Sequence, residues 1–109
     1  MKEYKIGDKT LKLATPVPKR VRGFLACLGL TTLSELTDKT KADAVGAFLL
    51  DFQLDEKKIK AVMDVCLHDN TITEWDDVPT EIINEIFSDF FVNVLQSYRK
   101  AQNSLSAFA

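Results

Sequence analysis

The sequence predicts a mainly α-helical fold: a small helical domain of about four helices, with an N-terminal β-hairpin and a long C-terminal helix. Apolar residues recur with helical spacing in several segments, whereas strict alternation of apolar and polar residues, which is typical of β-strands, is confined to residues 1–15. After Pro79 no glycine or proline interrupts the chain. The 109 residues are 46% hydrophobic and 28% charged, a composition typical of a globular protein, and they predict a single domain over 1–109.

Residues 1–15 are expected to form the hairpin. Glycine at the first position of the dipeptide Gly7-Asp8 favours a type II′ turn, because glycine tolerates the positive φ that this turn requires. An isolated hairpin is only marginally stable in water, so we expect its apolar face to pack on the helices. Two runs of alternating residues flank the turn, with these apolar positions: Tyr4, Ile6, Leu11 and Leu13.

Residues 18–67 are expected to form short amphipathic helices. Pro18 suits the first turn of one helix, and Gly29 suits its end. The segment 40–43 (TKAD) resembles a capping box for a second helix, and Asp55 can cap a third. Between the first two helices, residues 30–36 are expected to form a short turn or helix from which Leu33 and Leu36 face inward. The three helices share one apolar spacing, with Val21, Phe24, Leu25 and Leu28, then Val45, Phe48, Leu49 and Phe52, then Ile59, Val62, Met63 and Cys66.

An acidic, polar linker over 68–78, which contains Trp75, leads to the last helix. Pro79 opens this helix, and the apolar spacing extends it to about residue 104. A helix over 79–104 is ~39 Å long at 1.5 Å per residue. That length is large for a domain of this size.

This last helix carries more apolar surface than a core-facing helix needs. Its apolar arc sweeps roughly 220°, whereas an ordinary core-facing stripe is somewhat wider than 100°. In one interpretation the other helices wrap it and the whole arc is core. In the other, which we favour because three short helices do not readily cover ~39 Å, its later face binds another chain. The expected partner-binding residues are Phe87, Phe90, Phe91, Val94, Leu95 and Tyr98.

Charge is unevenly distributed along the chain, although the formal net charge is only −2. Residues 1–22 hold seven basic residues, and residues 69–89 hold seven acidic residues and no basic one. Two interpretations are open. The segments are either two solvated faces, or the basic end of one subunit attracts the acidic segment of the next.

The residue types that support catalysis or metal binding are scarce, so we predict no enzyme activity, no cofactor and no metal site. His68 is the single histidine, and a structural role at a helix end fits it better than catalysis. Cys27 and Cys66 lie among apolar residues with no base nearby, which favours free core thiols over a disulfide or a nucleophile. Asp76 and Asp77 precede Pro79 and fit a helix N-terminus better than an acid/base pair.

Neither nucleic acid nor a membrane is an expected partner. The candidate recognition helix carries Asp43 and Asp51, and the chain is net acidic. The longest uncharged stretch, 23–34, is too short to span a bilayer. The charged residues 1–5 also lack the apolar run of a secretory signal, so we expect a cytoplasmic protein.

Three segments together carry a resemblance to a known family. They are residues 5–13 (KIGDKTLKL), residues 75–81 (WDDVPTE) and the aromatic pair Phe90-Phe91 in the last helix. In the order of these parts, over most of its length, the chain resembles the tail assembly chaperones of long-tailed bacteriophages.

The resemblance implies a small helical protein of the host-cell cytoplasm that has no catalytic residues. Such a chaperone binds the long, helical tape measure protein and keeps it soluble until tail tube subunits replace it. The alternative is a structural or scaffold protein, of a virion or another assembly, that self-associates through its C-terminal helix. We expect a homo-oligomer.

Overall fold

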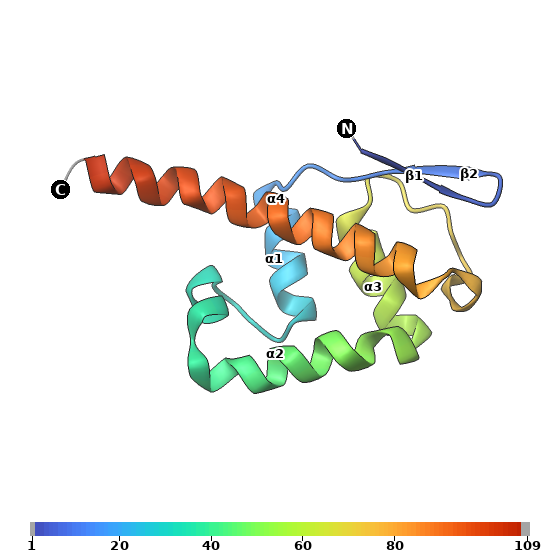
Figure 1. Ribbon diagram of the computed structural model, residues 1–109, viewed down its shortest axis with the longest axis horizontal. Coiled ribbons are helices and arrows are strands. Elements are labelled where there is room, and N and C mark those ends of the chain that lie inside the picture. The colour runs from blue at the N-terminus through green and yellow to red at the C-terminus, as the bar shows by residue number, and fades with distance from the viewer. Residues whose placement is uncertain (1, 108–109) are drawn as a thin grey trace.

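The structure, a computed structural model, describes residues 2–107 apart from the side chains at 37, 100–103 and 105–107. In that part of the chain it confirms the predicted class: four α-helices follow an antiparallel hairpin, and the last helix is the longest (Figure 1). The strands are β1 (Glu3–Ile6) and β2 (Lys9–Lys12), and the helices are α1 (Pro18–Cys27), α2 (Lys39–Asp51), α3 (Glu56–Cys66) and α4 (Thr80–Ala107). Three short 3₁₀ helices connect them: η1 (Leu33–Thr37), η2 (Phe52–Leu54) and η3 (Trp75–Asp77).

The hairpin has the predicted two-residue loop. Ile6 pairs with Lys9, and Gly7 has a φ of 60° while no residue other than glycine has a positive φ in the described chain. A positive φ at the first loop residue alone is the pattern of a type II′ turn. The apolar face of the hairpin is covered as expected, since Tyr4 and Leu11 are buried.

The helix ends agree with the sequence at three positions and differ at one. Pro18 is the first residue of α1, Gly29 follows the end of α1 with a φ of 75°, and the Asp55 carboxylate caps α3. The predicted capping box at 40–43 is wrong. Asp38 caps α2 instead, because its carboxylate accepts hydrogen bonds from both the backbone N–H and the hydroxyl of Thr40, at 2.9 and 2.7 Å.

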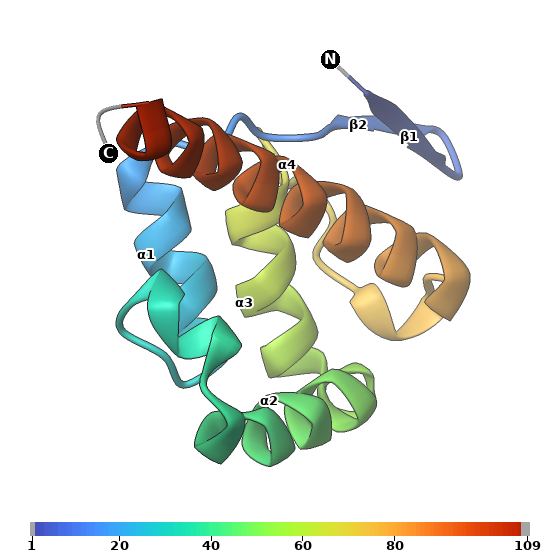
Figure 2. The same ribbon diagram turned by 60° about the vertical axis from the view of Figure 1, so that its left-hand side comes forward.

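The core lies where α1 and α3 pack beneath α4, and α2 runs along the far edge of the molecule (Figure 2). All the buried apolar residues form one cluster. α3 buries its whole predicted stripe, whereas α2 buries no residue. Trp75, which the sequence placed in a polar linker, is completely buried. The largest side chains at the centre are Trp75, Phe24, Phe52 and Phe90.

Arg20 fixes α1 to the end of α3. Its guanidinium donates to the backbone carbonyls of Val65 at 2.8 Å and of Asp64 and Leu67 at 3.1 Å. The last carbonyls of a helix have no partner within the helix, so a cation from a neighbouring helix satisfies them well.

The last helix extends beyond the body of the molecule. α4 has 28 residues, or ~42 Å, and the longest dimension of the whole chain is 51 Å. Among the side chains of α4 that the structure describes, Val94 is the last that is fully covered, and the helix then continues to Ala107 as a projecting end (Figure 1). The geometry of this end defines the candidate site.

Candidate functional site

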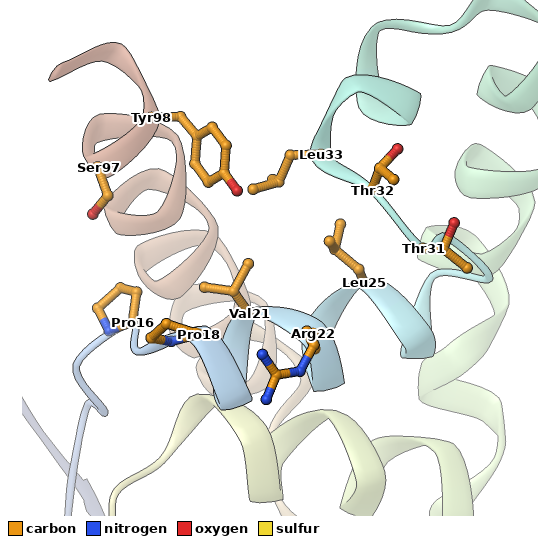
Figure 3. A pocket seen from close by; sticks show the side chains of 10 residues that line it. All are labelled: Pro16, Pro18, Val21, Arg22, Leu25, Thr31, Thr32, Leu33, Ser97 and Tyr98. Atoms are coloured by element: carbon orange, nitrogen blue, oxygen red, sulfur yellow. The ribbon is translucent and has the colours of Figure 1, made fainter. Parts of the chain in front are cut away.

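An apolar groove lies between the projecting end of α4, the face of α1 and the 3₁₀ turn η1. Its volume is about 470 Å³, which is in the range of protein binding pockets. Tyr98 and Leu33 point toward each other from opposite walls, and Val21 and Leu25 rise from α1 between them (Figure 3). The remaining lining residues are Pro16, Pro18, Arg22, Thr31, Thr32 and Ser97.

The η1 wall is held by a capping box formed by Thr32 and Glu35, which was not among the predicted helix caps. Glu35 Oε1 accepts hydrogen bonds from the Thr31 hydroxyl at 2.8 Å and from the backbone N–H groups of Thr31 and Thr32 at 3.0 and 2.9 Å. These bonds, with the Thr31 hydroxyl as the largest contribution, lower the pKa of Glu35 to about 2. The turn therefore presents Leu33 toward the groove in a fixed position at neutral pH.

The α4 wall is held by an aromatic cluster beneath it. The ring of Phe24 on α1 lies 5.2 Å from those of Phe87 and Phe90 and 5.7 Å from that of Phe91. Tilted aromatic pairs at such distances are favourable beyond the area that they bury. This cluster anchors α4 to α1 and leaves Tyr98, two turns further on, at the edge of the groove.

Three of the six predicted partner-binding residues are instead part of the core. Phe87, Phe90 and Val94 are buried, with 8%, 0% and 1% of their surface exposed. The hairpin helps the short helices to cover α4, since the Tyr4 hydroxyl donates a hydrogen bond to Asp89 Oδ2 on α4 at 2.6 Å. These residues are therefore removed from the candidate contact surface.

The other three predicted residues remain at or near the surface. Phe91 and Leu95 are half-buried, and Tyr98 is 44% exposed and lines the groove. The interior position predicted for Leu25 is confirmed, and Val21 and Leu33 are half-buried against the core; all three also border the groove. Apolar spacing identified these side chains as apolar positions of their helices. It does not show where α4 extends beyond the helices that cover it, and so it does not show which of these positions stay accessible.

The basic N-terminus meets the acidic segment within one chain. Lys2 Nζ lies 2.9 Å from Glu85 Oε1 and 2.7 Å from Asp89 Oδ2, and Lys9 Nζ donates to the carbonyl of Thr71 at 2.8 Å. Burial tends to raise the pKa of Asp89, but the hydrogen bonds from Lys2 and Tyr4 outweigh it and lower that pKa. The charges of Lys2, Glu85 and Asp89 are therefore paired within one chain and are not free to pair between neighbouring subunits.

Several titratable side chains outside the groove have a shifted pKa or a charged partner. Burial raises the pKa of the thiols of Cys66 and Cys27, which keeps both protonated at neutral pH. The hydrogen bond to Asp76 raises the pKa of Glu56. His68 Nε2 lies 3.6 Å from the carboxylate of Asp69. Within residues 2–107, no group of three or more His, Cys, Asp or Glu side chains is placed to hold a metal ion.

Two further findings concern the whole described chain. None of its helices combines the length and the apolar composition that crossing a bilayer requires. We found no match for the sequence among protein-family models or curated proteins, and no match for the fold among solved structures.

Proposed function

We propose that this protein is a tail assembly chaperone of a long-tailed bacteriophage, without enzyme activity, that acts in the cytoplasm of the host cell. In this proposal the groove between α1, η1 and α4 binds helical segments of the tape measure protein and keeps that protein soluble. The observation that carries the proposal is the groove itself: an apolar surface bounded by rigid elements, with Tyr98 exposed on one wall.

The shape and lining of the groove suit an amphipathic helix. Helix-binding grooves take apolar side chains at i, i+3, i+4 and i+7 of the bound helix. The half-buried Val21 and Leu33 and the exposed Tyr98 supply an apolar surface for such anchors, and the projecting end of α4 gives the client a second helix to lie against. Proline at two positions and the Glu35 capping box hold the walls in place, so that little ordering is required on binding.

The charges around the groove favour a client helix that carries carboxylates beside its apolar stripe. Arg22 lines the groove, and Lys19 and Arg99 are exposed next to lining residues. Among the ten described residues that line the groove, none is acidic. Opposite charges at the rim of an interface increase the association rate and select the orientation of the partner.

Co-expression with the tape measure protein tests the proposal. The client is the product of the long, coiled-coil-rich reading frame expected directly downstream, and the measured quantity is its soluble fraction. We expect Tyr98→Asp to lower that fraction by about tenfold, because a buried aromatic anchor contributes strongly to binding. Tyr98 is a better target than Phe91, because Phe91 also packs on Phe24 in the core.

Val92→Asp is the matched control. Val92 lies on the same helix and is 48% exposed, close to the 44% of Tyr98, but it does not line the groove. We expect the wild-type chain and Val92→Asp to keep the client equally soluble. A client that stays insoluble with the wild-type chain contradicts the chaperone. An unchanged client together with a Tyr98→Asp chain that turns from oligomer to monomer supports the scaffold alternative instead.

A further inference from the structure

The outer edge of β1 is a row of backbone groups with which no segment of the described chain pairs. Within residues 2–107 the sheet consists of β1 and β2, and it lies at the periphery of the molecule in both views (Figures 1 and 2). The backbone N–H of Leu13 donates to the carbonyl of Lys2 at 2.9 Å, so the even-numbered residues of β1 direct their backbone groups toward β2. The N–H and C=O groups of Glu3 and Lys5 therefore point outward.

The outer edge of β2, in contrast, is already occupied. The carbonyl of Lys12 accepts a hydrogen bond from the backbone N–H of His68 at 2.8 Å. The N–H of Ala14 donates to the carbonyl of Cys66, also at 2.8 Å. A free edge is a template for pairing with another strand, and in this hairpin the edge of β1 is the one that is open along the whole strand.

The two residues that point their backbone outward carry opposite charges. Glu3 and Lys5 are two positions apart, so their side chains lie on the same face of the hairpin, where both are exposed. Neither side chain belongs to an ion pair in the part of the chain that the structure describes. Both charges are therefore available to another strand.

A second copy of β1 fits this edge in one antiparallel register. When the two strands are centred on Tyr4, Glu3 of each copy lies opposite Lys5 of the other, and both positions are hydrogen-bonded pairs. A shift by two residues in either direction places Glu3 opposite Glu3 or Lys5 opposite Lys5, and it keeps only one hydrogen-bonded pair within the strand. Opposite charges across a strand pair are stabilising and like charges are destabilising, so the charges select the centred register.

The inner face of the hairpin is compatible with the same register. The two Tyr4 residues meet across the axis, and each is buried with its hydroxyl on Asp89 of its own α4 at 2.6 Å. Lys2 lies 2.9 Å from Glu85 and 2.7 Å from Asp89. It therefore offsets part of the acidic charge that α4 carries next to β1.

We propose that two copies of this chain associate through their β1 strands, which pair antiparallel about a two-fold axis at Tyr4 and form one four-stranded sheet. The Glu3–Lys5 pair occurs twice in this interface by symmetry. The assembly closes at two copies, because the outer edges of both β2 strands are occupied. The hairpin and the projecting end of α4 lie on opposite sides of Figure 1, so both grooves stay open and the interface does not depend on the proposed client.

The expected complex is a weak dimer. A single pair of short strands buries less than the ~1,200 Å² at which stable interfaces begin, so association requires concentrations well above those of tight complexes. Sedimentation velocity of the full chain from about 10 μM to about 1 mM covers that range. We expect a concentration-dependent shift from monomer to dimer. A wild-type chain that remains monomeric at the highest concentration overturns the proposal.

Two charge reversals test the register, first separately and then as a mixture. Glu3→Lys and Lys5→Glu should each weaken self-association about tenfold or more, because each places like charges opposite each other at two positions. An equimolar mixture of the two variants should associate about as well as the wild type, because the mixed dimer has opposite charges at both positions. Variants that each dimerise like the wild type, or a mixture that stays monomeric, overturn the proposal.

Lys60→Glu is the matched control for Lys5→Glu. Lys60 is also exposed and lies on α3, so its reversal changes the net charge equally but leaves the edge of β1 intact. We expect it to dimerise like the wild type, and thermal unfolding checks that all three variants keep the fold. A Lys60→Glu chain that loses dimerisation as fully as Lys5→Glu would show a general charge effect and would overturn the assignment to β1.

Amide signals locate the contact in the wild-type chain. By NMR, the backbone N–H groups of Glu3 and Lys5 should shift with concentration and exchange more slowly in the dimer, because they gain hydrogen-bond partners. The N–H of Thr10, which points outward from β2, should not change. Concentration-dependent changes that leave Glu3 and Lys5 unaffected would place the interface elsewhere and overturn the proposal.

Discussion

The helices α2 and α3 have the same apolar spacing in the sequence and very different places in the structure. α3 lies between α1 and α4 and buries Ile59, Val62, Met63 and Cys66. α2 lies at the edge and leaves Leu49 and Leu50 exposed. Periodicity therefore predicts a helix and its apolar face, but the neighbours that the fold supplies decide whether that face is core or surface. The same contrast divides α4 at Val94 into a buried half and a projecting half.

The largest expected effect separates the two halves of α4. Phe90→Ala should lower the free energy of unfolding by about 3–5 kcal/mol, because a completely buried ring is lost and a cavity remains. Tyr98→Ala should lower it by less than ~1 kcal/mol, because 44% of the Tyr98 surface is already exposed to water and its removal leaves no closed cavity. Urea unfolding of both variants measures the difference. Equal losses would mean that the division of α4 at Val94 is wrong.

A second prediction concerns the contact that fixes α3 in place. Arg20→Ala should lower the free energy of unfolding by about 2 kcal/mol, because carbonyls at the end of α3 lose a charged donor. Arg20→Lys should recover only part of that loss, since an ammonium group cannot reproduce the planar fork. Hydrogen exchange should report faster opening at 64–68 and little change in α2. An opening confined to α2 would contradict this assignment.

A third prediction uses pH to test how the hairpin covers α4. Tyr4→Phe should lower the free energy of unfolding by about 1 kcal/mol at pH 7, because the hydrogen bond to Asp89 is lost. The folded pKa of Asp89 lies below its usual 3.8, so the stabilisation is present above that pH and is lost as pH falls through the lowered value. The pKa of Tyr4 is raised above its usual 10.0 by burial and by Asp89, so the stabilisation is also lost at strongly alkaline pH.

Urea unfolding of the wild type and Tyr4→Phe at pH 7 and near pH 2 tests whether the stabilisation from the Tyr4–Asp89 hydrogen bond is lost at low pH. The two stabilities should converge at the lower pH. A difference that is constant between the two values would show that the Tyr4–Asp89 contact does not depend on the carboxylate charge.

The smallest expected effect is a gain of stability in α2. Gly46→Ala should raise the free energy of unfolding by about 0.5–1 kcal/mol at low protein concentration, because alanine favours the helix and has open space there. Urea unfolding measures the gain, and a variant that is equally or less stable than the wild type would contradict the open space at this position.

Much of the fold follows from local patterns in the sequence. The hairpin turn at Gly7, the start of α1 at Pro18 and the cap at Asp55 each depend on a residue whose backbone or side-chain chemistry is specific. The N-cap of α2 was predicted at the wrong residue, because aspartate and threonine are both good N-cap residues. Only the structure shows that Asp38 is the N-cap. The burial of Trp75 was not predicted, because its neighbours in the sequence are polar and form no apolar periodic pattern with it.

The candidate site was only partly predictable, for a physical reason. Tyr98 was identified from the apolar stripe of α4. The same stripe also predicted Phe87, Phe90 and Val94 as contact residues, although these three are buried in the core. Which residues a helix exposes depends on where its neighbours end, and that depends on contacts between residues far apart in the sequence. The Arg20 contact and the groove wall at Leu33 arise in the same way.

The most direct test of the account follows the methyl groups of the groove by NMR. The full chain, labelled at leucine and valine methyls, is titrated with a helical segment of the tape measure protein. The account predicts that the signals of Val21, Leu25 and Leu33 shift on binding while those of Leu50 and Leu54 do not. Shifts at Leu50 and Leu54 with an unchanged groove, or no shifts at any methyl, would contradict it.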